Sequence, residues 1–199
     1  AAYSYYTQDY YGDAISELKR FIRNYPANDN LDYAYFLLGT CYYELIVDEK
    51  KDLSSLLNSK KYFDIVIKEY PNTDFALDAK FKLNLIANTL ASKEIYIGKY
   101  YMSKKKWIPA INRFKNVVNK YEKTEYVEEA LHRLVEVNYI IGLEKEAIKY
   151  AALLGYNYQS SEWYKESYRV FNKDYEDPKD KIKKNKQNVI IRNFKKIFK

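Results

Sequence analysis

The residue types on which most active sites and crosslinks depend are scarce in this chain. It has one cysteine and one histidine in 199 residues, which excludes an internal disulfide and any metal site built from several Cys and His ligands. Cys41 lies beside Tyr42 on an apolar helix face, without evident His or Asn partners, so we expect a packed thiol rather than a nucleophile. His132 is expected to be a surface or packing residue. No acidic pair stands out either, and we predict a protein that is not an enzyme and needs no cofactor.

Helix-breaking residues and long hydrophobic runs are also few. With five glycines, four prolines and no sustained alternation of polar and apolar residues, the chain favours helices over strands. No apolar run reaches the roughly 18 residues needed to cross a membrane, and no signal peptide is visible. The chain begins inside a first helix, and Tyr5 stands at the tyrosine position of a repeat whose opening residues are missing. We therefore expect a processed or truncated product.

The net charge of +7 is concentrated at the C-terminal end of the chain. Residues 173–199 contain ten basic and four acidic residues, so the preceding 172 residues are close to neutral. A near-neutral body offers no basic groove, and we predict no nucleic-acid partner. The 24 tyrosines could suit base stacking, but their joint enrichment with Ile, Asn and Lys favours core packing and compositional drift.

A recurring spacing organises the sequence. Four small residues are each followed four positions later by an apolar one, in the pairs Ala14 and Leu18, Ser59 and Phe63, Ala110 and Phe114, and Ala147 and Ala151. Prolines stand twelve residues after the first two, at Pro26 and Pro71. A Leu-Gly-x2-Tyr pattern precedes Ser59, and a related Ile-Gly-x2-Tyr precedes Ala110. Together these features indicate tetratricopeptide (TPR) repeats of about 34 residues.

This pattern predicts an all-α fold, a TPR-like α-solenoid of stacked antiparallel helix hairpins over residues 1–172. Small residues let paired helices approach, and rings and Leu fill the space between hairpins. Gly39 and Ser59 are 20 residues apart where a standard repeat needs 12, so we expect an inserted loop within IVDEKKDLSSLLN. Asn30 or Asp32, and Ser160 or Ser161, are candidate helix caps. The expected helices are 1–10, 12–25, 31–46, 54–69, either one long central helix or two helices with a minor kink over 73–106, then 108–120, 127–141, 144–154 and 160–171.

The last 27 residues form a separate basic tail, residues 173–199, with an amphipathic helix near 188–199. Its apolar face is made of Ile190, Ile191, Phe194, Ile197 and Phe198. The opposite face carries Arg192, Lys195, Lys196 and Lys199. The sequence leaves three roles open for this helix: docking on the repeat array, insertion into the groove of a partner, or binding to an anionic membrane surface.

Three stretches in this order resemble the BamD family, TPR lipoproteins of the machinery that assembles β-barrels in the bacterial outer membrane. They are YYGDAISELKRFIRNYPANDNLDYAYFLLG, YPNTDFALDAKFKL and EIYIGKYYMSKKKWIPAINRFKNVVNKY. The resemblance covers roughly residues 1–155 and lacks the family's first hairpin and lipidated N-terminus. The chain departs from the family at Glu122, where proline is usual, and in its basic tail.

The resemblance implies a scaffold on the periplasmic face of the outer membrane, anchored by an N-terminal lipid absent from this sequence. The implied partners are the POTRA region of the barrel subunit BamA, other lipoproteins of the assembly machinery, and unfolded outer-membrane proteins. The basic tail could add a further membrane contact. Arg113 matches the family's partner-contacting arginine and is the first candidate for the BamA interface. Trp107 is the second, with packing of the hairpin turn as its alternative role.

The repeat register also suggests a peptide groove. With Gly39 at the eighth repeat position, the residues lining the concave face are Tyr33, Phe36 and Tyr43, and the preceding repeat adds Tyr3 and Tyr6. Such an aromatic stripe suits a peptide that ends in an aromatic residue. The alternative is that these rings are covered by the missing first hairpin.

Two other functions remain open at this stage. One is a cytosolic TPR co-chaperone adaptor that binds a C-terminal carboxylate. Lys80 and Asn84 have a suggestive spacing for such a clamp, but the earlier positions are aromatic. The other is a periplasmic TPR scaffold for cell-envelope proteins.

Overall fold

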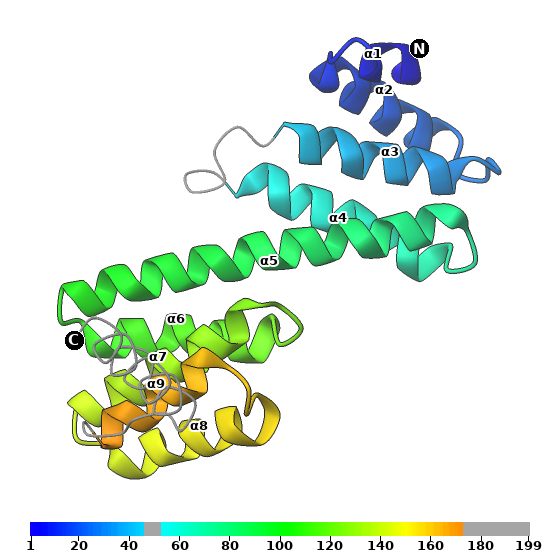
Figure 1. Ribbon diagram of the computed structural model, residues 1–199. Helices are drawn as coiled ribbons and strands as arrows, with labels where there is room; N and C mark the ends of the chain where they lie inside the picture. Colours follow the sequence, from blue (N-terminus) through cyan, green and yellow to red (C-terminus); the bar gives the residue numbers. More distant parts are fainter. Residues whose placement is uncertain (46–52, 173–199) are drawn as a thin grey trace, which may run out of the picture. The chain divides into compact units, whose positions relative to one another are not determined.

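The computed structural model describes residues 1–45 and 53–172 of the chain, and within them every regular element is a helix (Figure 1). The helices are α1 (Ala2–Tyr6), α2 (Tyr11–Asn24), α3 (Leu31–Glu44), α4 (Ser54–Glu69), α5 (Asp74–Ser103), α6 (Trp107–Lys120), α7 (Tyr126–Ile140), α8 (Glu144–Asn157) and α9 (Glu162–Phe171). The predicted all-α, TPR-like class is confirmed. None of the helices in these two stretches is both long and apolar enough to cross a membrane.

The described residues divide into two compact units. The first unit comprises residues 1–97 and 120–126, and the second comprises residues 98–119 and 127–172. The central helix α5 belongs to both, because its last residues, from Gly98 onward, belong to the second unit. The predicted division between a repeat domain and a tail at residue 173 stays a prediction, since the tail lies outside the described residues.

Most helix boundaries follow the local signals in the sequence. Pro26 and Pro71 stand directly after the C-caps of α2 and α4, where a missing backbone donor does no harm. Pro109 lies in the first turn of α6, which tolerates proline. Ser161 caps α9, because its side chain accepts a hydrogen bond from the Trp163 amide. The long central helix is confirmed as one helix of 30 residues.

Three boundary predictions differ from the structure. The first helix ends at Tyr6 rather than near residue 10, because the chain turns through Asp9, whose φ of 61° is left-handed. Asn30 occupies the N-cap of α3 without a capping side-chain hydrogen bond, whereas Asp32 Oδ1 accepts from the Tyr33 amide in the first turn at 2.6 Å. Asn28 Oδ1 accepts from the Asn30 amide in the preceding turn. Helix α8 continues to Asn157, past the expected end at residue 154.

In two of the hairpins, α3–α4 and α5–α6, a glycine faces an aromatic ring on the paired helix. A Cβ atom placed on Gly39 in α3 would lie 2.8 Å from Phe63 Cε1 in α4. The hydroxyl of Ser59 donates to the Gly39 carbonyl at 2.9 Å, which satisfies a buried polar group at the same contact. In the second unit, a Cβ atom on Gly98 would lie 2.7 Å from Phe114 Cζ. The small positions of the repeat therefore set how closely paired helices approach.

Buried apolar residues from these hairpins form the core. In the first unit, one cluster joins α2 and α3 around Ala14, Leu38 and Cys41, and another joins α3, α4 and α5 around Phe63. Cys41 is fully buried, and burial raises the pKa of its thiol to about 11, as expected for a packing residue. In the second unit, Phe114 is fully buried.

Replacing Gly98 with alanine tests this packing. The added methyl group has no room beside the buried ring of Phe114, so we expect a loss of about 1–3 kcal/mol in the free energy of unfolding, larger than the gain in helix propensity. Denaturant titration followed by circular dichroism measures the change. Gly12→Ala is the matched control, since a Cβ atom there meets nothing within 4 Å. Equal stability of the two variants would contradict the proposed role of the close approach.

Candidate partner-binding surfaces

Aromatic side chains from three helices gather on one face of the first unit. Tyr3 and Tyr6 of α1 have ring centroids 6.5 Å apart. Tyr33 and Phe36 of α3 lie 5.3 and 5.5 Å from the ring of Phe75 in α5. We call this set the aromatic face; its members are Tyr3, Tyr6, Tyr33, Phe36, Tyr43 and Phe75.

The members of the aromatic face differ in how much surface they offer. Tyr3 is 59% exposed, whereas Tyr33 and Phe36 are only partly accessible. Burial raises the pKa of Tyr33, and the nearby Tyr3 and Tyr6 raise it further, so these three predicted residues lie close together. Phe36 also contacts the buried Phe63 at 5.6 Å and therefore contributes to the core as well as to the surface.

A positive charge lies beside the same set. The Nζ atom of Lys82 in α5 stands 4.7 Å from the centroid of the Tyr43 ring, a distance suited to a cation–π interaction. The aromatic face thus combines apolar rings with a cation. Such a surface favours peptides that carry aromatic side chains and negative charge.

Helix α5 carries a second exposed apolar feature that the sequence analysis did not single out. Leu77, Phe81 and Leu85 repeat every four residues and are 62%, 64% and 37% exposed. The signal was present in the sequence as an i, i+4 spacing. Spacing alone predicts the helix but does not reveal which face of it lacks a partner.

The co-chaperone adaptor would need Lys80 and Asn84 to bind a carboxylate together, but the pocket beside Asn84 does not include Lys80. Asn84 lines a small pocket of about 260 Å³ together with Lys60, Lys120 and Lys123. Lys80, its expected companion, is exposed and is not among the residues around that pocket.

The two predicted BamA-contact residues lie on α6 in the second unit. Trp107 is the first residue of α6 and is partly buried. Arg113 is partly buried as well and interacts within the fold. Ile108, beside Trp107, is 62% exposed. At the end of α5, Lys104 lies 5.8 Å from the ring of Tyr100, which is 54% exposed. The surface of this unit thus offers cations and apolar groups together.

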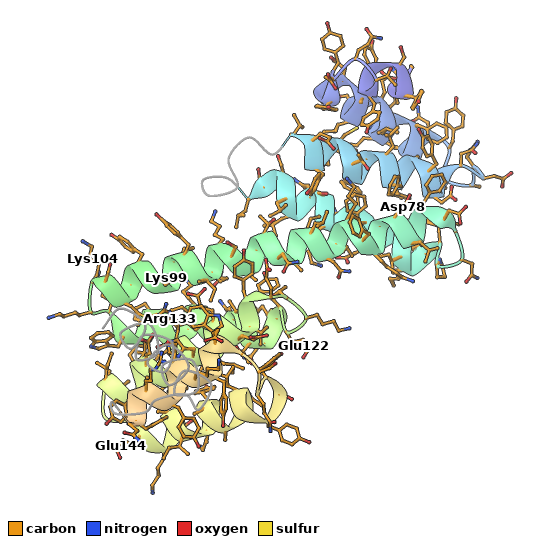
Figure 2. The ribbon with its side chains drawn as sticks, in the orientation of Figure 1. Asp78, Lys99, Lys104, Glu122, Arg133 and Glu144 are labelled. Carbon is orange, nitrogen blue, oxygen red and sulfur yellow. The ribbon has the colours of Figure 1, made fainter. Side chains whose placement is uncertain are left out.

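A chain of ion pairs stiffens the second unit. Lys99 at the end of α5 contacts Glu129 of α7 at 3.0 Å, and Glu129 also meets Arg133 at 3.4 Å. Arg133 reaches Glu136 at 2.6 Å. Figure 2 marks Lys99 and Arg133. Because Glu129 is only 14% exposed, these pairs are shielded better than ordinary surface pairs.

The single histidine joins α7 to α9. His132 is buried, and its Nδ1 lies 2.9 Å from Ser167 Oγ, while Nε2 faces Glu136 at 3.6 Å. The Ser167 hydroxyl also donates to the carbonyl of Trp163 at 2.9 Å. With Ser167 1% exposed, this Ser-His-Glu set is a packing contact and not a nucleophilic site.

Two further points concern metal ligands and the parts of the chain that the structure does not describe. Residues 1–45 and 53–172 contain no group of three His, Cys, Asp or Glu side chains that could hold a metal ion. The apolar face of the tail, formed by Ile190, Ile191, Phe194, Ile197 and Phe198, lies outside the described residues, as does most of the inserted loop.

Comparison with known proteins decides the family. Residues 1–154 match the family described as YfiO, outer membrane lipoprotein. The chain belongs to this family. It is 44% identical over 169 residues to the outer membrane protein assembly factor BamD of Rickettsia prowazekii, covering 85% of this chain and 67% of that protein. The BamD of Caulobacter vibrioides is 39% identical over 170 residues, covering 85% of this chain and 56% of that protein.

A more distant member has the same name. The BamD of Neisseria gonorrhoeae is 31% identical over 140 residues, or 65% of this chain and 52% of its own length. This YfiO family member therefore spans between about half and two thirds of the relatives it matches. The family match ends inside α8, so α9 and the tail lie beyond it.

Acid should weaken the second unit through Glu136. Burial acts to raise the pKa of this carboxyl, but hydrogen bonds and charge from His132 and Arg133 outweigh it, and the pKa lies below its ordinary value of 4.5. A lowered pKa stabilises the native state above the unfolded value, and that stability is lost as the pH falls through the folded value. We expect the unfolding free energy to drop as the pH falls below 4.5, and to drop less in Glu136→Gln.

Urea titrations of both proteins between pH 3 and pH 7 provide the measurement. Glu144→Gln serves as the control, since Glu144 is an exposed residue at the start of α8. Identical pH profiles for the wild type and Glu136→Gln would show that the ion-pair chain does not contribute.

Proposed function

We propose that this chain is a non-enzymatic scaffold of the machinery that assembles β-barrels in the outer membrane, working on its periplasmic side. The observation that carries the proposal is membership of the YfiO family, whose relatives in Rickettsia and Caulobacter are both named outer membrane protein assembly factors. The paired helices support it, because such repeats bind other polypeptides through extended surfaces. In line with the family description as a lipoprotein, a lipid holds the protein at the membrane.

The second unit contacts the POTRA region of BamA, with Arg113 at the centre of the interface and Trp107 at its edge. A planar guanidinium that is already partly buried loses little entropy on pairing with a carboxylate. The neighbouring exposed Ile108 supplies the apolar area that a specific interface requires. Other lipoproteins of the machinery bind the remaining surface.

Charge reversal at Arg113 tests this interface. In a pull-down with the POTRA segment from the same organism, Arg113→Glu should lose about 2 kcal/mol or more of binding free energy, at least roughly a thirtyfold change in Kd, because it leaves a partner charge unpaired. Lys115→Glu is the matched control, an equal charge change on an exposed residue of the same helix. Equal binding by the wild type and Arg113→Glu would remove Arg113 from the interface, provided circular dichroism shows both folded.

The aromatic face of the first unit receives unfolded barrel substrates. Its rings contact one another and form a surface on which an aromatic side chain can pack, and Lys82 offers a counter-charge to a peptide carboxylate. Tyr6, Tyr33 and Phe36 are partly buried and form the inner part of this surface, and the exposed Tyr3 forms its outer part.

Tyr3→Ala is the clean test of this second surface. Phe36 contacts the core, so its truncation would change stability as well as binding. We expect Tyr3→Ala to weaken a peptide ending in phenylalanine by about 1 kcal/mol, or roughly fivefold in Kd, with unchanged thermal stability. Fluorescence anisotropy of a labelled peptide measures it. Tyr25→Ala is the control, since Tyr25 is equally exposed at 59% but lies outside the aromatic face. Matching losses in both variants would indicate a nonspecific effect.

A further inference from the structure

A groove of about 610 Å³ lies between the last two described helices, α8 and α9. Its lining is mainly apolar and aromatic and includes Ile148, Gly155, Tyr156, Tyr164, Tyr168 and Phe171. Four of these side chains are exposed, Ile148 by 57%, Tyr156 by 87%, Tyr168 by 47% and Phe171 by 37%. Neither the partner surfaces described above nor the family match, which ends at residue 154, accounts for this groove.

Both walls of the groove are held firmly. A Cβ atom on Gly155 would lie 2.7 Å from Tyr164 Cε2, so α8 and α9 touch at their closest point. On its other side, α9 is tied to α7 by the His132–Ser167 contact and by the ring of Phe171, 5.4 Å from that of Tyr139. The two helices that line the groove are therefore packed against each other, and α9 is also packed against α7.

The first unit shows how this fold closes an equivalent groove. Ala14 of α2 and Ala147 of α8 occupy the same repeat position, so α2 and α3 correspond to α8 and α9. Helix α4 lies beside the α2–α3 pair, because Tyr62 of α4 lines the same cavity as Ile22 of α2 and Tyr35 of α3, and its ring stacks on that of Tyr42 at 5.7 Å. Repeat geometry thus calls for one more helix after α9.

We propose that the chain's own tail supplies this helix, with residues 188–199 docked in the α8–α9 groove. The segment places five apolar side chains on one face, as the groove requires. Its twelve residues would form a helix of about 18 Å, close to the roughly 15 Å of α9 and 21 Å of α8. In this arrangement the tail completes the last hairpin and covers the exposed end of the repeats.

Tethering and charge favour this occupant over a free partner. The last described residue, Asn172, itself lines the groove. The connecting residues 173–187 can span up to about 50 Å, and a short tether gives a local concentration in the millimolar range. Residues 126–172 contain seven acidic and five basic residues, so this stretch is negatively charged. Residues 173–199 contain four acidic and ten basic residues, so the tail is positively charged. The opposite signs attract, and Arg192, Lys195, Lys196 and Lys199 remain on the outward, polar face.

Site-specific photo-crosslinking in the full chain tests the proposal. The photoreactive residue p-benzoylphenylalanine replaces Tyr156, whose 87% exposure makes the substitution tolerable. We expect an intramolecular crosslink to residues 188–199, identified by peptide mass mapping. The same residue placed at Tyr25, exposed in the first unit, provides the positional control.

Two double substitutions in the tail distinguish docking of its apolar face from an effect of its net charge. Ile191→Asp with Phe194→Asp should reduce the crosslink yield roughly tenfold or more, because a carboxylate in an apolar groove loses its hydration. Arg192→Gln with Lys196→Gln changes the net charge equally but on the polar face, and should leave most of the yield.

The remaining outcomes overturn the proposal. Crosslinks to a second copy, seen as a doubled mass, would make the groove a dimer contact. If no crosslink to residues 188–199 forms, the tail is excluded as the occupant of the groove. This holds whether or not the protein floats with phosphatidylglycerol vesicles in a tail-dependent way. None of these results depends on the proposed role in barrel assembly.

Discussion

The fold depends on the contact between a residue with little or no side chain and an aromatic ring on the next helix. Gly39 against Phe63, Gly98 against Phe114 and Gly155 against Tyr164 repeat this contact along the chain. Removing the Cβ atom lets the two helix backbones approach, and the ring then fills the space that the approach creates. One methyl group at such a site must displace a packed ring, so the spacing of each hairpin has little tolerance.

The same contact also leaves aromatic rings at the surface of the helices. The side of a helix that carries the small residues packs against its hairpin partner. Aromatic residues on another side of the same helix are then left partly exposed. This is why the aromatic face contains Tyr3, Tyr33 and Phe36. The exposed Leu77 and Phe81 on α5 have the same origin. Flat rings offer large contact area at low entropic cost, which suits recognition of extended polypeptides.

The buried polar and charged residues of the second unit connect its helices to one another. His132, Ser167 and Glu136 could be mistaken for a catalytic set from their residue types, but the hydroxyl is buried and donates to a backbone carbonyl. The ion pairs from Lys99 through Glu129 to Arg133 hold the end of α5 against α7. The His132–Ser167 contact also holds α9, one wall of the α8–α9 groove, against α7.

The sequence by itself determined the helical class, the repeat register and nearly all helix ends, because spacing, proline positions and caps act within a few residues. It also led to the family through the quoted stretches. Only the tertiary structure decided how much of each side chain stays exposed. Phe36 proved to belong partly to the core, Leu77 and Phe81 proved to be exposed, and His132 proved to bridge to Ser167, 35 residues away. The physical reason is that periodicity tells which residues share a helix face, whereas burial depends on which other helix covers that face.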